Sequence, residues 1–296
     1  MAGTGARAKA RAASETKPKK KIWQEVEEAE AKKLSNRARA ANGRRRQVAI
    51  VYDIEGPKVR LGVGWFVLVI AALYAGQWPL ALLYSVIAAL AGLQAARAWR
   101  RRGSAANPPV AALIAGGLAL AGALSTAALG LAVLVAVGLS ILSTIATTKP
   151  LVSAAHTLQS GLWVGAGAAG LGVAYRYHSS AALGLVLVVS AYEIGDFIVG
   201  SGARNAIEGP IAGAAAVLVV QFTISVLGLV EPFTISNGLM FAALAAVLCP
   251  LGQVVASLAL PSVRAKAPAM RRLDSLILLG PVWALEAGIA LANRPI

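Results

Sequence analysis

The chain has 296 residues, of which 57% are hydrophobic and only 14% charged, and its formal net charge is +15. Soluble domains carry roughly 25% charged residues, so this composition excludes an ordinary water-soluble protein and favours one that lies largely in a membrane. With one cysteine and two histidines, the sequence also excludes an intrachain disulfide and a metal site rich in cysteine or histidine.

Residues 1–60 form a basic segment that holds 16 of the 28 lysines and arginines, against 7 acidic residues. No apolar stretch in it is as long as a signal-peptide core, so we expect neither a cleaved signal nor a span here. We predict a cytoplasmic tail, partly disordered or helical, in which Glu28 and Lys32 have the favourable i,i+4 spacing. Two roles stay open for this tail: it attracts anionic lipid headgroups, or it only fixes the orientation of the chain in the membrane. Specific nucleic-acid binding is not expected, because no aromatic pattern is interleaved with the basic residues.

Residues 61–296 contain long, continuous apolar stretches separated by short polar or proline-containing segments. Roughly 20 apolar residues cross a bilayer as an α-helix, whereas the strands of a membrane barrel would alternate, so we predict an all-α polytopic transmembrane helical bundle. The third and fourth stretches are weakly separated, which leaves eight spans as the alternative to nine. Gly161, Gly165 and Gly172 in the fifth span predict a close helix-packing face. The nine predicted spans lie near residues 61–76, 79–96, 109–125, 127–146, 152–173, 180–200, 209–230, 236–259 and 273–292.

Positive charge predicts the orientation of these spans, because cytoplasmic loops are enriched in lysine and arginine. With the basic tail inside, nine spans place ten of the remaining basic residues inside and only two, Arg176 and Arg294, outside. We therefore predict a cytoplasmic N-terminus, an external C-terminus and insertion in the plasma membrane. The ten internal residues are Arg97, Arg100, Arg101, Arg102, Lys149, Arg204, Arg264, Lys266, Arg271 and Arg272.

Acidic residues at membrane depth are the most informative signal in such a chain. A carboxylate in the middle of a span costs roughly 2.5–3.5 kcal/mol on insertion scales, so it is usually functional or paired. Glu193 and Asp196 stand three residues apart near the end of the sixth span. They share one helix face and are close enough to hold a cation together.

A polar, glycine-containing turn follows this span, from Ser201 to Gly209. Such a turn permits close backbone approach to a phosphate, with Arg204 as an anion partner. The purely structural alternative is a helix end capped by glycines, with an Arg204–Glu208 ion pair.

The last internal loop ends in Arg271-Arg272-Leu273-Asp274-Ser275. An acidic residue in the first turn of a helix is favourable with the helix dipole, which is the structural interpretation of Asp274. The functional interpretation is that Asp274 binds a divalent metal while the arginines neutralise a nucleotide. Because the charge rule places both clusters on the cytoplasmic side, we favour the functional interpretation.

These clusters resemble the signature of the phosphatidate cytidylyltransferase (CDP-diacylglycerol synthase) family. Its members carry Asp-x-Gly-Ala-Tyr at the end of a span, then Ser-Pro-Lys-Lys-Thr-x-Glu-Gly, Gly-Asp-x-x-Glu-Ser and Asp-Arg-x-Asp-Ser. The resemblance covers the membrane region, most clearly residues 150–290, and includes the number of spans. The corresponding segments here are Glu193-Ile-Gly-Asp-Phe, Arg204-Asn205-Ala-Ile-Glu208-Gly209, Gly252-Gln-Val-Val-Ala-Ser257 and Arg271-Arg272-Leu273-Asp274-Ser275.

Several signature residues differ in this chain. Arg271 replaces the first aspartate of the last motif, Gln253 and Ala256 replace acidic residues, and Arg204 and Asn205 replace paired lysines. The family's Lys-Asp pair and its histidine-containing glycine turn have no counterpart. These departures favour, as an alternative to an active enzyme, an inactive homologue that binds lipid or acts in membrane interactions.

The resemblance implies a transmembrane cytidylyltransferase-like domain over residues 61–296 that converts phosphatidate and CTP to CDP-diacylglycerol and pyrophosphate in phospholipid biosynthesis. It implies Mg²⁺ held by Asp274, Glu193 and Asp196, with Asp274 and Arg272 as catalytic residues. The residues that it implies for nucleotide or phosphate binding are Arg204, Asn205, Glu208, Gly209, Arg271 and Ser275.

Two further functions and one assembly are also compatible with the sequence. One function is a CTP-using enzyme that acts on another lipid acceptor, and the other is a secondary transporter, which would require inverted repeats that we do not detect. The expected partners are CTP and membrane lipids, above all anionic phospholipid and phosphatidate. Association of glycine-rich helix faces predicts a possible homodimer.

Overall fold

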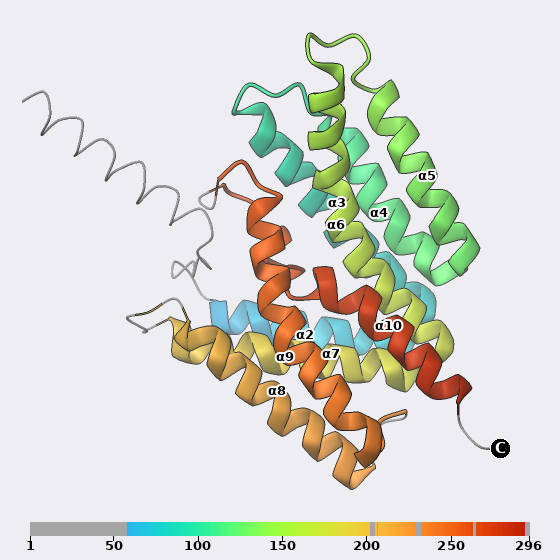
Figure 1. Ribbon diagram of the computed structural model, residues 1–296, viewed down its shortest axis with the longest axis vertical. Coiled ribbons are helices and arrows are strands. Elements are labelled where there is room, and N and C mark those ends of the chain that lie inside the picture. Colours follow the sequence, from blue (N-terminus) through green and yellow to red (C-terminus); the bar gives the residue numbers. More distant parts are fainter. Residues whose placement is uncertain (1–57, 202–204, 206, 229–231, 263–264, 294–296) are drawn as a thin grey trace, which may run out of the picture. The chain divides into compact units, whose positions relative to one another are not determined.

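The computed structural model describes residues 58–201, 205, 207–228, 232–262 and 265–293 (Figure 1). All of these belong to one unit of the chain, residues 48–296. The predicted basic tail lies outside the described residues, apart from its last three positions, which begin the first helix. Arg204, Arg264 and Arg294 also lie outside them.

The described part of the chain consists of helices joined by turns and loops and contains no strand, which confirms the prediction of an all-α fold. It holds nine α-helices and one short 3₁₀ helix, η2. The helices are α2 (Lys58–Ala75), α3 (Gln77–Arg100), α4 (Pro108–Leu124), α5 (Thr126–Leu142), α6 (Pro150–Tyr177), α7 (Ser179–Gly200), α8 (Glu208–Leu227), α9 (Ile235–Leu258), η2 (Met270–Arg272) and α10 (Leu276–Ala292).

Four of these helices are long and apolar enough to cross a membrane: α3, α7, α8 and the Asn237–Leu258 part of α9. Four others, α2, α4, α5 and α10, contribute apolar stretches of 17 residues or fewer. The structure therefore confirms a helical membrane protein. It does not confirm nine spans, because the shorter helices fall below the roughly 20 residues that a bilayer requires.

Polar residues define helix boundaries that hydropathy alone did not predict clearly. Ser125 has an extended backbone between α4 and α5, and its Oγ accepts a hydrogen bond from the Ala128 N–H at 2.9 Å. Asn107 caps α4 in the same way by accepting from Val110 N–H at 3.3 Å, with Pro108 in the first helical position. These caps satisfy N–H groups that a helix start leaves unpaired. The third and fourth apolar stretches are therefore two helices.

The helix α6 packs against α3, α4, α5, α7 and α10, and its contacts with α4 and α10 bring the backbones too close for side chains. A Cβ added at Gly161 would lie 2.6 Å from the Ala111 carbonyl oxygen, and one added at Gly170 would lie 2.2 Å from the carbonyl carbon of Gly280. Only glycine fits such approaches. The close-packing face predicted around Gly161 is confirmed.

Side-chain hydrogen bonds tie the end of α3 to the segment that precedes α10. The Trp99 indole N–H donates to the Ala259 carbonyl oxygen at 2.9 Å, and the Gln94 Oε1 accepts from the Ala269 N–H at 3.0 Å. The Ser104 hydroxyl, just beyond α3, contacts His156 Nδ1 near the start of α6 at 2.8 Å. The loops after α3, before α6 and after α9 therefore lie at one end of the helix bundle.

The opposite helix ends meet in a second group. Gln77, at the start of α3, donates from Nε2 to the carbonyl oxygen of Ala123 near the end of α4. The Tyr177 ring, at the end of α6, lies against Gly288 near the end of α10, where an added Cβ would meet its Cε2 at 2.9 Å. These two groups of helix ends are those that alternating spans would place on opposite sides of a membrane.

Candidate functional site

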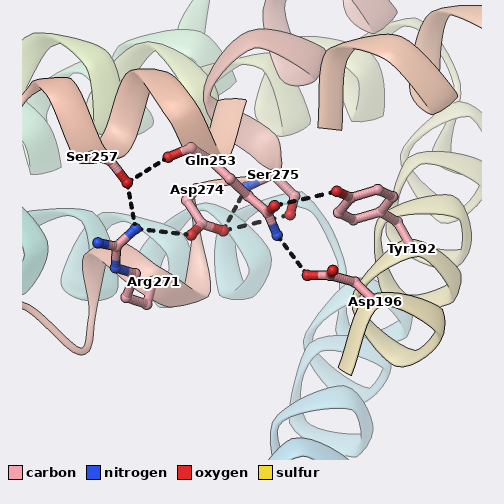
Figure 2. Close-up of polar contacts among 7 residues, drawn as sticks. All are labelled: Tyr192, Asp196, Gln253, Ser257, Arg271, Asp274 and Ser275. Atoms are coloured by element: carbon pink, nitrogen blue, oxygen red, sulfur yellow. Dashed lines mark hydrogen bonds and ion pairs between the residues drawn. The ribbon is translucent and has the colours of Figure 1, made fainter. Parts of the chain in front are cut away.

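Two segments that the sequence singled out, residues 193–196 and 271–275, contribute to one buried polar cluster (Figure 2). Asp196 near the end of α7 is 5% exposed, and Asp274 between η2 and α10 is 6% exposed. The helix α9 supplies the third side, with Gln253 and Ser257 also buried. The helix α9 approaches this region closely because residue 252 is a glycine, whose added Cβ would lie 2.4 Å from the Asp274 carbonyl oxygen.

Gln253 connects α9 to two residues of α7. The Tyr192 hydroxyl donates to Gln253 Oε1 at 3.2 Å, and Gln253 Nε2 donates to Asp196 Oδ2 at 3.0 Å. Both ends of the amide are therefore used, which fixes its orientation. The Asp196 carboxylate gains a neutral amide partner within the membrane protein.

Arg271 connects the segment before α10 to α9. Its Nη1 donates to Ser257 Oγ at 3.0 Å and lies 3.7 Å from Asp274 Oδ2. The Ser257 hydroxyl donates in turn to the Gln253 carbonyl oxygen at 2.9 Å, and the Ser275 N–H donates to Asp274 Oδ1 at 2.8 Å. Asp274 is therefore held on both of its oxygens.

Burial raises the pKa of Asp274 above its ordinary value, because a charged carboxylate is disfavoured away from water. The Arg271 guanidinium and the Ser275 backbone N–H act in the opposite direction, since both favour the charged form. Repulsion by Asp196 raises the pKa further. The two carboxylates are therefore close enough to interact, although they come from different elements.

A cavity of about 30 Å³ lies beside the cluster and is lined by both Glu193 and Arg272. The Glu193 Oε1 is buried and has no hydrogen-bond partner among the described residues. A cavity of this size has room for at least one water molecule. The residues that line it are Trp65, Phe66, Val69, Tyr84, Leu171, Leu185, Val186, Val189, Ser190, Glu193, Arg272 and Leu276.

Of the predicted nucleotide-binding turn, the structure describes Ser201, Asn205 and residues 207–209. Asn205 Nδ2 donates to Glu208 Oε1 at 2.9 Å on an exposed surface, and Gly209 is buried in the first turn of α8. In the part of the chain that the structure describes, no hydrogen bond or ion pair joins this Asn205–Glu208 pair to the polar cluster. Arg204, the anion partner expected here, lies outside the described residues.

The carboxylates predicted to hold Mg²⁺ do not form a ligand set in the described residues. No three aspartate, glutamate, histidine or cysteine side chains among them are arranged to hold a metal ion. Asp196 is hydrogen-bonded to the Gln253 amide and Asp274 is paired with the Arg271 guanidinium, so neither presents its oxygens jointly with Glu193. Magnesium binding by these residues stays a prediction.

Sequence reasoning did not identify Tyr84 and Ser190 as members of the site. Ser190 stands three residues before Glu193 on α7, so the helical spacing alone would have placed it on the same face. Tyr84 gave no comparable signal, because it lies in a different span, α3, and reaches the cavity only through the packing of α3 against its neighbours.

No family model matches the chain, and no curated protein matches it significantly. The likeness to cytidylyltransferases therefore rests on the motif residues, of which Glu193, Arg272 and Asp274 lie in or beside the polar cluster.

Proposed function

We propose that this chain is an integral membrane enzyme that transfers the cytidylyl group of CTP to phosphatidate, forming CDP-diacylglycerol and pyrophosphate. One observation carries the proposal. Residues 193–196 and 271–275, which bear the two best motif matches, contribute to one buried polar cluster beside a cavity shared by Glu193 and Arg272. Buried carboxylates and guanidinium groups are costly within a membrane protein, so they favour a function at this place.

In the proposed reaction, a phosphate oxygen of the lipid attacks the α-phosphorus of CTP, and the bond from that phosphorus to pyrophosphate breaks. Such transfers require positioning and compensation of phosphate charge more than covalent participation by the protein. Arg272 lines the cavity and offers two parallel N–H donors to phosphate oxygens, while Asp274 holds Arg271 beside it. Arg204, Asn205, Glu208, Gly209 and Ser275 stay candidates for nucleotide binding.

We also propose nine membrane crossings, a cytoplasmic N-terminus and insertion in the plasma membrane. The helix α6 and the shorter helices α2, α4, α5 and α10 would complete the nine crossings around the four long helices. The separation of helix ends into two groups supports alternation. The group that includes the end of α3 carries the run Arg100–Arg102, which the positive-inside rule assigns to the cytoplasm.

The proposal is tested by assaying the purified full-length chain in lipid vesicles with labelled CTP, phosphatidate and magnesium chloride. We expect labelled CDP-lipid, and a loss of at least about 100-fold in rate for Arg272→Gln and Asp274→Ala, since removing one charge-stabilising group typically costs 10²–10³ in rate. Glu286→Gln, a carboxylate change in α10 outside the polar cluster, is the matched control and should retain activity. Absence of CDP-lipid above the Asp274→Ala background would overturn the proposal.

A second candidate function, a non-catalytic lipid-binding protein, is favoured by the small cavity and by the Arg271–Asp274 pair, which already neutralises one carboxylate. It predicts saturable phosphatidate binding without magnesium-dependent CTP binding in calorimetry. A panel of lipid phosphates and isoprenoid alcohols in the same assay separates this function from a CTP-using enzyme with another acceptor.

A further inference from the structure

Arg271 brings a positive charge to the place where α9 meets the segment before α10 (Figure 2). Its Nη1 lies 3.0 Å from Ser257 Oγ and 3.7 Å from Asp274 Oδ2. A magnesium ion would need oxygen ligands of this kind, drawn to about 2.0–2.1 Å from its centre. The guanidinium therefore lies where oxygen atoms of two elements converge, which is the position that a metal ion would have to take.

Other oxygen atoms of the buried carboxylates are also engaged by N–H donors. The Ser275 N–H donates to Asp274 Oδ1 at 2.8 Å, and Gln253 Nε2 donates to Asp196 Oδ2 at 3.0 Å. Each hydrogen bond uses lone-pair density that a metal ligand would donate, and directs a positively polarised hydrogen atom at it. The cluster therefore satisfies both aspartates with donors of its own.

Glu193, the third predicted metal ligand, faces a different group of residues. The cavity that it lines also contains Arg272, but neither Asp196 nor Asp274 is among the lining residues. The two arginines thus lie on either side of the segment's turn, one beside Asp274 and one in the cavity of Glu193. The carboxylates are paired with nearby guanidinium groups rather than gathered around a common point.

The charge of Arg271 also disfavours a cation at this place. A guanidinium stays protonated at any physiological pH, so it cannot leave its charge to make room for a metal. Asp274 is 6% exposed and the Arg271 side chain 23% exposed, so little water screens the region. Repulsion between a divalent cation and a guanidinium a few ångströms away is strong in such surroundings.

We propose that Arg271 takes the place of a divalent metal in this chain. Its guanidinium is the permanent counter-ion of Asp274, and the polar cluster holds no metal ion of its own. The Mg²⁺ that the resemblance predicts on Asp274, Glu193 and Asp196 then has no site, and magnesium in the assay of the proposed reaction serves only as the counter-ion of CTP. The geometry of the cluster carries this inference without any assumption about the reaction.

The test measures Mn²⁺ binding to the full chain in phosphatidylcholine nanodiscs, by electron paramagnetic resonance of the free ion and without CTP. Mn²⁺ is a suitable probe because it takes the same oxygen ligands as Mg²⁺. We expect the native chain to bind no more Mn²⁺ than its Asp274→Ala variant, and to unfold at the same temperature in Mn²⁺ and in EDTA. Native binding of one Mn²⁺ per chain that is lost in Asp274→Ala would overturn the inference.

Variants of the arginine give the converse test. Arg271→Asp should bind Mn²⁺ at least about 10-fold more tightly than the native chain, because a positive charge is removed and an oxygen ligand is added at the same place. Arg271→Lys keeps the charge and should gain no Mn²⁺. Arg100→Asp, at an exposed position at the end of α3, makes the same change of charge elsewhere and is the matched control.

Thermal unfolding, followed by exposure of the buried Cys249 thiol, shows which variants are folded. A folded Arg271→Asp variant that binds Mn²⁺ no better than Arg100→Asp contradicts the inference. Where Arg271→Asp does not fold, the comparison of the native chain with Asp274→Ala still decides.

This inference and the proposed function fail in different ways. A chain that forms CDP-lipid and binds Mn²⁺ through Asp274 upholds the enzyme and overturns the replacement of metal by arginine. A chain that gains Mn²⁺ only as Arg271→Asp, but forms no CDP-lipid, upholds the replacement and overturns the enzyme.

Discussion

Gln253 accepts a hydrogen bond from Tyr192 and donates one to Asp196, in a cluster where Asp274 lies close enough to Asp196 to repel it. A neutral amide at this position satisfies one carboxylate without adding charge. A carboxylate in its place would add a third acidic side chain and would lose the donor that Asp196 now uses. The identity of this one residue therefore sets how many carboxylates the cluster offers to a divalent cation.

We predict that Gln253→Glu lowers the stability of the chain in the absence of divalent cations and creates a cation site. Magnesium or manganese at 100 times its dissociation constant should then restore about 2.7 kcal/mol, by linkage between binding and folding. The measurement is thermal unfolding with and without cation, followed by a thiol-reactive dye on Cys249. Gln159→Glu on α6 is the control, and an equal cation response in both variants would refute the prediction.

Arg271 is a second residue whose change has a calculable outcome. Its guanidinium is the partner of a buried carboxylate, and its side chain is 23% exposed, so the pair is only partly shielded from water. Arg271→Gln should lower the free energy of unfolding by about 2–3 kcal/mol, somewhat less than for a fully buried pair, because Asp274 is left without a counter-ion. Adding Asp274→Asn should recover most of this loss. A double variant that is as unstable as the sum of the two singles would show that the pair is not coupled.

At the scale of elements, the sequence predicted which segments are helices better than how they pack. The predicted apolar stretches correspond to helices because polar caps and prolines end helices by local chemistry, as Ser125 and Asn107 do in the structure. Helices that are apolar on all sides carry no amphipathic pattern to say which face meets which neighbour. The position of α2 beside Glu193, and of Tyr84 in the cavity, were therefore beyond sequence reasoning.

Close packing between α9 and the segment before α10 gives an element-scale prediction. A Cβ at Gly252 would lie 2.4 Å from the Asp274 carbonyl oxygen, so Gly252→Ala must push α9 away from the polar cluster. We expect a loss of about 1–3 kcal/mol in stability, as for overpacked cores. Gly130→Ala on α5, where a Cβ meets nothing within 4 Å, is the matched control and should not destabilise. Equal melting temperatures for the two variants would contradict the packing described here.

At the scale of the whole molecule, the candidate site was only partly predictable. The charge rule predicted that residues 193–196 and 271–275 lie on the same side of the membrane, and the fold joins them through Gln253 of α9. The rule assigns a side but not a lateral position, so it could not predict that Gln253 of α9 lies between the two segments. That position depends on which helices are neighbours.

The proposed topology makes the last prediction, because nucleotide and lipid can meet at the cluster only if it is reached from the cytoplasm. Cys249 is fully buried and is the chain's one cysteine, so an engineered exposed thiol reports its own side of the membrane. In intact cells, a membrane-impermeant maleimide should label Ser179→Cys and Asn293→Cys. It should label Ala105→Cys and Thr148→Cys only after the membrane is opened. These four positions retain every lysine and arginine, so the charge bias that orients the chain is unchanged. Labelling of Ala105→Cys and Thr148→Cys from opposite sides would break the alternation across α4 and α5 and, with it, the nine-span arrangement.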